Sequence, residues 1–375
     1  MKPNVFMFVN YTPRDKSIGI TKKIEAEIDA FRKLGYSVTY SAYIEDGVGI
    51  FSDDDELMFS QKYRVKNKKY QSLKRYFLLV DTCQKYIDSS DVKFELCYGR
   101  LSAPTNSYIK LLSTMKSKGM RTIIEAHAYF PGIKFKSLKG KYIAFMLEKN
   151  SKKLKSCVDR FLTEGHIDDF YGVPTKETRV GVATEKITPH KYLGNKEVLN
   201  LISVANETVY HAYDRIIRSI AEYKKKDGPI NVKLHLVGTV SDATKKLIND
   251  LGASEYVILY GKQYGEKLDD IYNACNMGVG PLGQHRIGGK KDTGLKTKEY
   301  FAKGLPYFYS GNEMDILRGY PYICEVPSDE SLISIEDLWR FYNTYSNNDN
   351  VVGEMRAFAQ KEFSWPSIIK QAISD

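Results

Sequence analysis

A basic segment containing one carboxylate, residues 281–306, carries the residues best suited to chemistry in this chain. It reads PLGQHRIGGKKDTGLKTKEYFAKGLP: an apolar run, a glycine-rich cationic loop, and a short helix that contains Glu299 and stops at Gly304. Helix N-termini attract anions through their N–H groups and dipole, and lysine or arginine adds full charge. The segment therefore predicts a site for a phosphorylated ligand. Because a carboxylate repels phosphate, Glu299 indicates that the ligand also has hydroxyls, as a ribose does.

Two cations of this segment are candidates for catalysis. We expect Arg286 and Lys296 to stabilise the charge that develops on a leaving phosphate, although both could instead be solvated loop charges. The residues around the start of the helix could bind the ligand, or could simply cap the helix. These candidates are Lys290, Lys291, Thr293, Gly294 and Leu295.

Alternating strand and helix signals determine where this segment lies. In the first half, strands are predicted at 2–10, 36–43, 92–98, 121–127, 158–163 and 178–183, with helices at 20–34, 76–88, 106–118 and 139–156 between them. The charged stretch 45–75 is predicted to be irregular, with a short helix at 56–61. In the second half, strands at 198–205, 231–237, 255–260, 277–282, 305–309 and 321–326 alternate with helices at 209–226, 241–250, 266–274 and 295–303. Such alternation is typical of parallel βαβ units.

The predicted fold class is therefore α/β, with two tandem Rossmann-like, doubly wound domains facing a cleft. We place the first domain at residues 1–193 and the second at 194–357, with a linker near 190–196. A C-terminal helix, about 358–375, is a candidate to pack back on the first domain. Open parallel sheets bind ligands at the carboxyl ends of their strands. The segment after strand 277–282 should therefore face that cleft.

The excess of basic over acidic residues lies entirely in the first half of the chain. Residues 1–195 hold 34 Lys and Arg against 22 Asp and Glu, which leaves the rest of the chain slightly acidic within a net charge of +10. Residues 62–75 carry seven basic and no acidic side chains, and a second basic stretch covers 134–155. Such stretches attract polyanions such as an anionic membrane surface, or they are simply solvated faces. No signal peptide or membrane span is evident, and the five scattered cysteines indicate a reducing compartment, so we expect a cytoplasmic protein, peripheral at the inner face of the cell membrane.

The second half resembles the donor-binding domain of GT-B glycosyltransferases of family 4, of the type found in bacterial capsule and exopolysaccharide clusters. The matching pieces are SVANETVYHAYDRII, VKLHLVG, YVILYG, LDDIYNACNMGVGPLG and HRIGGKKDTGLKTKEYFAKGLP; FVNYTPRDKSIGI and TIIEAHAYFPG resemble the acceptor domain more loosely. The resemblance implies a retaining, hexosyltransferase-like enzyme of polysaccharide biosynthesis. It implies transfer from a UDP- or GDP-sugar to a saccharide or lipid-linked saccharide, without a metal or other cofactor.

Several residues match the family motif position by position. Glu299 matches the glutamate that contacts the ribose, but Lys291 stands where relatives carry a second glutamate. The cation pair expected after strand 198–205 is altered, with His211 near the usual lysine and Arg215 beyond it. His127 matches a family position near the reacting sugar, although a lone histidine is often structural, and Gly19 is interpreted as a turn glycine whose backbone closely approaches the donor or acceptor.

Other interpretations remain open from the sequence. The acidic run 53–55 formally offers a metal-binding carboxylate pair, but acids also suit the start of a helix. An epimerase of the same fold, or a non-catalytic nucleotide-sugar-binding protein that has lost the position of Lys291, would share the donor site. A nucleic-acid-binding protein would suit the pI near 9.0, but no nucleic-acid-binding signature is present, so no nucleic-acid partner is expected.

Overall fold

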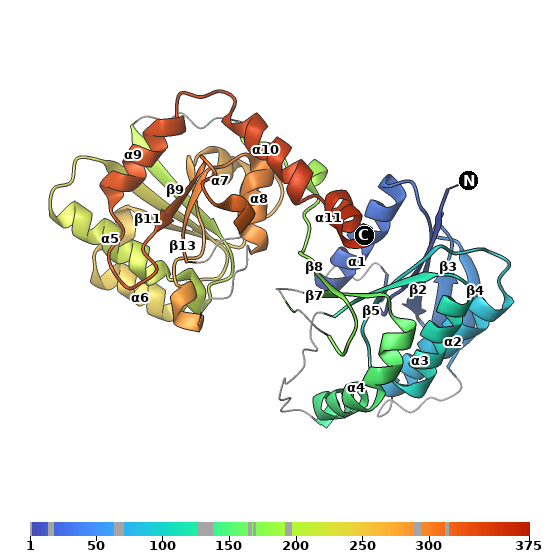
Figure 1. The fold of residues 1–375 in the computed structure, drawn as a ribbon. Coiled ribbons are helices and arrows are strands. Elements are labelled where there is room, and N and C mark those ends of the chain that lie inside the picture. The colour runs from blue at the N-terminus through green and yellow to red at the C-terminus, as the bar shows by residue number, and fades with distance from the viewer. Residues whose placement is uncertain are drawn as a thin grey trace. The chain divides into compact units, whose positions relative to one another are not determined.

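The computed structural model describes residues 2–13, 19–63, 71–126, 138–163, 167, 170–191, 197–288, 294–311 and 315–375. The chain divides into two compact units (Figure 1). Unit 1 comprises Met1–Val180 together with Trp365–Asp375, and unit 2 comprises Gly181–Ser364. The division therefore falls earlier in the chain than the linker placed at 190–196, and the last helix belongs to unit 1.

Unit 1 contains a sheet of eight strands in the order β4-β3-β2-β1-β5-β6-β7-β8. Its strands are β1 (Asn4–Phe8), β2 (Ser37–Ile44), β3 (Gly47–Phe51), β4 (Leu57–Lys62), β5 (Leu96–Arg100), β6 (Arg121–Glu125), β7 (Arg160–Thr163) and β8 (Thr175–Glu177). All neighbours pair in parallel except β2 with β3 and β3 with β4. The helices are α1 (Gly19–Lys33), α2 (Gln71–Ser89), α3 (Asn106–Ser117), α4 (Leu138–Cys157) and α11 (Trp365–Ile373).

The central strand β1 shows why this sheet is covered on both faces. Phe6 and Phe8 belong to a buried cluster with residues of α2, α3 and α4, whereas Val5 and Met7 belong to a second cluster with residues of α1 and α11. Because successive side chains of a strand point to opposite faces, the continuous apolar run of β1 serves two cores at once. The C-terminal helix α11 completes the second core.

Unit 2 contains six parallel strands in the order β11-β10-β9-β12-β13-β14, the arrangement of a doubly wound dinucleotide-binding sheet. The strands are β9 (Val198–Val204), β10 (Asn231–Val237), β11 (Val257–Gly261), β12 (Met277–Val279), β13 (Tyr307–Ser310) and β14 (Ile323–Val326). The helices are α5 (Tyr213–Lys225), α6 (Asp242–Asp250), α7 (Glu266–Asn273), α8 (Leu295–Lys303), α9 (Ile335–Tyr345) and α10 (Val351–Glu362). Short 3₁₀ helices include η2 (Thr184–Lys186), η3 (Val209–His211), η4 (Ala253–Glu255), η5 (Gln284–Ile287) and η6 (Asp315–Leu317).

Three local predictions were wrong. No strand forms at 178–183, and the last strand of the unit 1 sheet, β8, lies just before it at Thr175–Glu177. The described part of the stretch 45–75 is not irregular: β3 and β4 extend the sheet, and the expected helix at 56–61 is the edge strand β4. Edge strand β4, LMFSQK, groups its apolar residues together and is largely exposed, so it lacks the alternation of apolar and polar residues that identifies a half-buried strand. The expected helix 209–226 is interrupted at Ala212, whose left-handed backbone (φ 48°) separates η3 from α5.

Among the described residues, no helix combines the length and the apolar character that crossing a bilayer would require.

Candidate functional site

The carboxyl edge of the unit 2 sheet brings a lysine, a serine and a tyrosine together from three elements. Lys296, in the first turn of α8, donates a hydrogen bond from Nζ to Ser203 Oγ at 3.2 Å. Ser203 is the penultimate residue of β9, and its Oγ lies 2.8 Å from the hydroxyl of Tyr213 at the start of α5. Ligands of open parallel sheets bind at this edge. Lys296, a candidate from the sequence for contact with a phosphate, therefore lies at the edge of the sheet where ligands of this fold class bind.

The charge of Lys296 is not balanced by the described part of the protein. Its side chain is buried, and Ser203 is its only hydrogen-bond partner among the described residues, which offer it no carboxylate. Burial lowers the pKa of Lys296 to about 7. Because a buried ammonium without a counter-ion is costly, the arrangement favours an anionic ligand that supplies the missing charge.

His211 supplies a neutral hydrogen-bond donor beside this lysine. Its Nδ1 accepts the backbone N–H of Thr208 at 3.0 Å, and its ring stacks on Tyr213 with centroids 5.4 Å apart. Burial, and then the charge of Lys296, lower the pKa of His211 to about 3. The ring is therefore neutral near pH 7, with its proton on Nε2. No described residue accepts that proton, so it is available to a ligand oxygen.

Glu299 lies one helical turn beyond Lys296 on α8. Its carboxylate is partly buried and forms no hydrogen bond or ion pair with the described residues. Burial raises its pKa, and only the nearby charge of Lys303 opposes this shift. Lys303 itself is paired with Asp269 at 2.6 Å. Such a carboxylate, without a partner among the described residues and partly buried, suits a pair of ligand hydroxyls, and its ribose contact stays a prediction.

The described residues leave the start of α8 unobstructed. Gly294 is the N-cap, none of the described atoms lies within 4 Å of the position a Cβ would take, and Leu295 is half-exposed. The carbonyl of Gly294 already accepts the N–H and hydroxyl of Thr297. The remaining predicted ligand-binding residues of this loop, Lys290, Lys291 and Thr293, lie outside the described residues.

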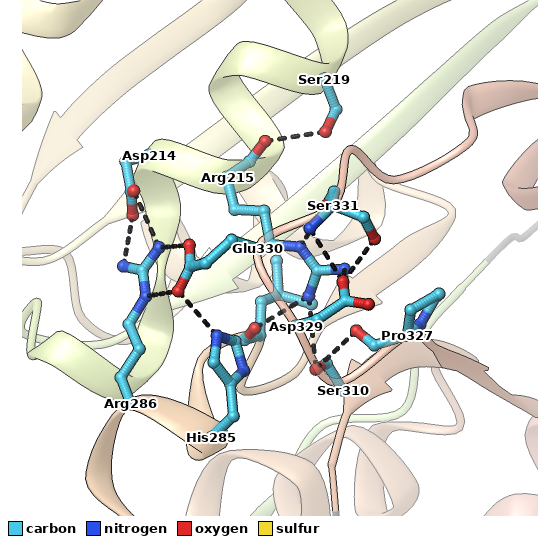
Figure 2. Close-up of polar contacts among 11 residues, drawn as sticks. Asp214, Arg215, Ser219, His285, Arg286, Ser310, Pro327, Asp329, Glu330 and Ser331 are labelled. Carbon is cyan, nitrogen blue, oxygen red and sulfur yellow. Dashed lines mark hydrogen bonds and ion pairs between the residues drawn. The ribbon is translucent and has the colours of Figure 1, made fainter.

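Arg286 is held by two carboxylates rather than facing the anion site alone. Figure 2 shows its guanidinium between Asp214 and Glu330. Its two terminal nitrogens donate to Asp214 at 2.8 and 2.9 Å, and Nε and one terminal nitrogen donate to Glu330 at 2.8 and 2.5 Å. These bonds raise the pKa of Arg286 further above its usual value. Its charge is therefore already compensated within unit 2.

Arg215 is buried and connects elements of unit 2. Its Nε donates to the carbonyl of Ser331 at 2.6 Å, and one terminal nitrogen donates to Leu282 O at 3.1 Å and Ser310 Oγ at 3.3 Å (Figure 2). The residue is only 2% exposed. The structure therefore does not bring Arg215 to the ligand-accessible side of the site, and its contacts are those of a structural residue.

Comparisons with known proteins support the architecture. No protein-family model matches the sequence, and no curated protein matches it either. The glycosyltransferase from Rickettsia africae ESF-5 superimposes with a TM-score of 0.61 at 13% identity, covering 99% of this chain and 96% of that one. HepE of Anabaena, in complex with UDP, gives 0.54 at 11% identity, and WaaG, a glycosyltransferase involved in lipopolysaccharide biosynthesis, gives 0.52 at 12%; each covers 98% of both chains. The chain has the GT-B fold.

In the first unit of this GT-B chain, the predicted site residues are only partly described. Gly19 is the first residue of α1, and His127 lies outside the described residues. Its neighbour Glu125 is buried in an ion network at the end of β6. There it pairs with Lys23 at 3.4 Å and Arg100 at 3.3 Å, and it accepts from the Tyr98 hydroxyl at 2.6 Å. Glu125 thus has a structural role.

The acidic run at 53–55 has a protein partner in this GT-B chain. Asp53 accepts from Arg32 Nε at 3.2 Å and from the N–H of Val38 at 3.1 Å, and Asp55 pairs with Arg32 at 2.6 Å. These carboxylates therefore attach the β3–β4 connection to α1 and β2. Within the described ranges, no group of three or more His, Cys, Asp or Glu side chains is placed to hold a metal ion.

Sequence reasoning missed three residues of the site. Ser203 and Tyr213 contact the Lys296 side chain directly or through one hydroxyl, and Glu330 holds Arg286. Ser203 could have been found from its place at the end of a predicted strand. Glu330 carried no signal, because it lies in a loop after β14, 44 positions from Arg286.

Proposed function

We propose that this chain is a retaining, metal-independent glycosyltransferase of family 4. It transfers a sugar from a nucleotide-sugar to a saccharide or lipid-linked saccharide in the synthesis of a cell-surface polysaccharide. The observation that carries the proposal is the combination of Lys296, His211 and Glu299 at the carboxyl edge of the unit 2 sheet. One unbalanced cation, one neutral N–H donor and one unpartnered carboxylate match a diphosphate and a ribose.

The proposed chemistry needs charge stabilisation at the leaving group. The bond between the sugar C1 and the diphosphate oxygen breaks, and its electron pair goes to that oxygen. The acceptor hydroxyl oxygen bonds to C1, and in the scheme implied by the family resemblance its proton passes to the same phosphate. Lys296 and the Nε2–H of His211 are positioned to stabilise the growing negative charge in a buried site, so no separate base or metal is required.

The fold neighbours favour uridine nucleotides as the first donors to test. HepE was solved with UDP, and WaaG acts in lipopolysaccharide biosynthesis. These facts concern HepE and WaaG. For this chain they are the reason to test UDP and UDP-sugars before other nucleotides.

The donor class is tested by a thermal-shift screen of the purified protein with UDP, GDP, ADP and their sugars, in EDTA. We expect one nucleotide family to raise Tm by several degrees at about 100 times its Kd, since this concentration adds about 2.7 kcal/mol. The same shift is expected with added manganese. No shift with any nucleotide would contradict the proposal, and a shift that requires manganese would contradict its metal-free form. Release of an epimerised nucleotide-sugar without an acceptor would indicate an epimerase.

We propose further that unit 1 docks on an anionic membrane surface through its basic residues, 62–75 and 134–155. Within the described part of these stretches, α4 buries Ile143, Leu147 and Leu154 and exposes two aromatic side chains, Tyr142 (44%) and Phe145 (58%). Exposed lysines lie on the same helix at positions 141, 149, 152, 153 and 155, and Lys149 Nζ lies 6.0 Å from the centroid of the Phe145 ring. A face of aromatic and lysine side chains suits the interface of an acidic bilayer.

Co-sedimentation tests this docking with phosphatidylcholine vesicles that contain or lack phosphatidylglycerol. We expect binding only to the acidic vesicles, and Lys149→Ala should weaken it about fivefold, since a surface lysine contributes about 1 kcal/mol. Phe145→Ala should weaken it further, whereas Lys245→Ala, an exposed lysine of unit 2, serves as the control. Equal binding to neutral vesicles would contradict electrostatic docking.

A further inference from the structure

The guanidinium of Arg286 joins three segments that are distant in sequence. Asp214 lies in the first turn of α5, Arg286 lies in η5, and Glu330 follows β14. Glu330 also accepts from His285 Nε2 at 2.7 Å, so both side chains of the His285-Arg286 pair bind one carboxylate (Figure 2). We call Asp214, Arg286 and Glu330 the carboxylate clamp.

The neighbouring residue of α5 strengthens the same connection. Arg215 donates to the carbonyl of Ser331, directly after Glu330, and Ser331 N and Oγ both bond to Asp329 Oδ1 at 2.8 and 2.5 Å. The 329–331 segment is therefore held directly by Arg215 of α5 and, through Arg286, by Asp214 of the same helix. The hydrogen bond from Arg215 to Ser331 therefore helps to keep the carboxylate of Glu330 within hydrogen-bonding distance of Arg286.

The other end of η5 is held against the segment that carries His211. The N–H of Gly283 donates to Tyr210 O at 2.9 Å, and a Cβ on Gly283 would lie 2.8 Å from the Cβ of Ala212. Only glycine fits this approach. Because the clamp joins η5 to the start of α5, and Gly283 joins η5 to Tyr210 and Ala212, the clamp holds the segment that carries His211 against η5.

Competition with a ligand is unfavourable for Arg286. A phosphate that recruited it would have to replace four charge-assisted hydrogen bonds to two carboxylates. Those carboxylates would then be left next to an incoming anion. Arg286 is better placed to hold protein segments than to bind the donor.

From these contacts we infer that Arg286 is a positioning residue: with Asp214 and Glu330 it aligns His211 for diphosphate binding, without touching the donor. This inference rests on the proposed function, and it replaces the phosphate contact predicted for Arg286 from the sequence. The carboxylate partner, Glu330, becomes a residue on which ligand binding depends.

Substituting the carboxylate distinguishes the two roles. If Arg286 is a positioning residue, Glu330→Gln weakens binding of the nucleotide selected by the thermal-shift screen about fivefold, as expected for a coupling near 1 kcal/mol. Arg286→Lys weakens it similarly, because lysine lacks the planar fork that spans two carboxylates. The double variant, Glu330→Gln with Arg286→Ala, should bind the nucleotide no more weakly than Arg286→Ala alone. The inference is wrong if Glu330→Gln leaves nucleotide affinity unchanged, because binding would then not depend on the clamp. It is also wrong if Glu330→Gln tightens binding, because Arg286, released from Glu330, would then bind the phosphate itself.

A second readout does not depend on nucleotide binding. Histidine side-chain NMR of the nucleotide-free protein should show a shifted His211 signal in Glu330→Gln. Glu325→Gln, an exposed carboxylate of the neighbouring β14, should leave that signal in place. An unmoved His211 signal in Glu330→Gln overturns the inference. If no nucleotide binds the wild-type protein, the proposed function fails, while the NMR comparison still tests the clamp.

Discussion

Replacing Lys296 with methionine is expected to weaken nucleoside diphosphate binding by about 10- to 100-fold, the range for losing hydrogen bonds to a charged group. The same change is expected to raise Tm. Methionine fills the buried path of the lysine side chain without bringing an unpaired ammonium into the protein. Calorimetric titration and thermal unfolding of the same samples measure both effects. A residue whose loss stabilises the fold but removes binding is one that the ligand, and not the fold, requires.

The pH dependence gives Lys296 a distinctive signature. Its pKa is lowered to about 7, so an anion that needs the charged form should bind less tightly as pH rises above 7, approaching a tenfold loss per pH unit. UDP-glucose is a suitable probe, since its diphosphate does not titrate in this range. Stability should change in the opposite direction: the unfolded chain binds a proton that the folded chain lacks, so unfolding free energy rises with pH above 7. Both trends should be absent in Lys296→Met.

Lys245→Met, on the exposed face of α6, is the matched control and should alter neither trend. Unchanged affinity in Lys296→Met, or a fall in Tm, would show that Lys296 is part of the packing and not of the anion site.

Replacing Glu299 with alanine is expected to weaken UDP binding by about 10- to 100-fold, provided that UDP is the nucleotide bound. The carboxylate is partly buried and without a partner among the described residues, so the two ribose hydroxyls would be its main hydrogen-bond donors. Glu299→Gln should have an intermediate effect, because an amide has only one acceptor oxygen. Calorimetry with UDP and its 2′-deoxy analogue measures the contact directly.

The analogue separates a ribose contact from a general effect. Wild-type protein should prefer UDP to the deoxy compound, and Glu299→Ala should lose most of that preference. The control is Glu222→Ala, at a partly exposed residue of α5 whose one ion pair within the described ranges is with Lys226. Wild-type affinity in Glu299→Ala would remove the residue from the site.

Short-range patterns were the most predictable part of the fold. The helix predicted at 295–303 is α8 with the same bounds, because an open glycine precedes it and Gly304, in a left-handed conformation, ends it. The β3–β4 hairpin was missed because β3 is short and has two glycines among its five residues, and the edge strand β4 is largely exposed, so both are recognised by their pairing with each other and with β2. Ala212 was placed inside a helix because nothing in its own sequence requires a left-handed backbone.

By itself, the sequence determined the properties that depend on neighbours in the chain: alternating strands and helices, the basic loop at the end of a strand, and Glu299 within the helix that follows. Only the tertiary structure decided which charges are compensated. Lys296 and Arg286 look equivalent in sequence, yet one is buried beside a serine hydroxyl and the other is bound by two carboxylates from α5 and the 329–331 segment. The reason is physical. The charge that a side chain offers to a ligand depends on its burial and counter-ions, and both are supplied by residues distant in the chain.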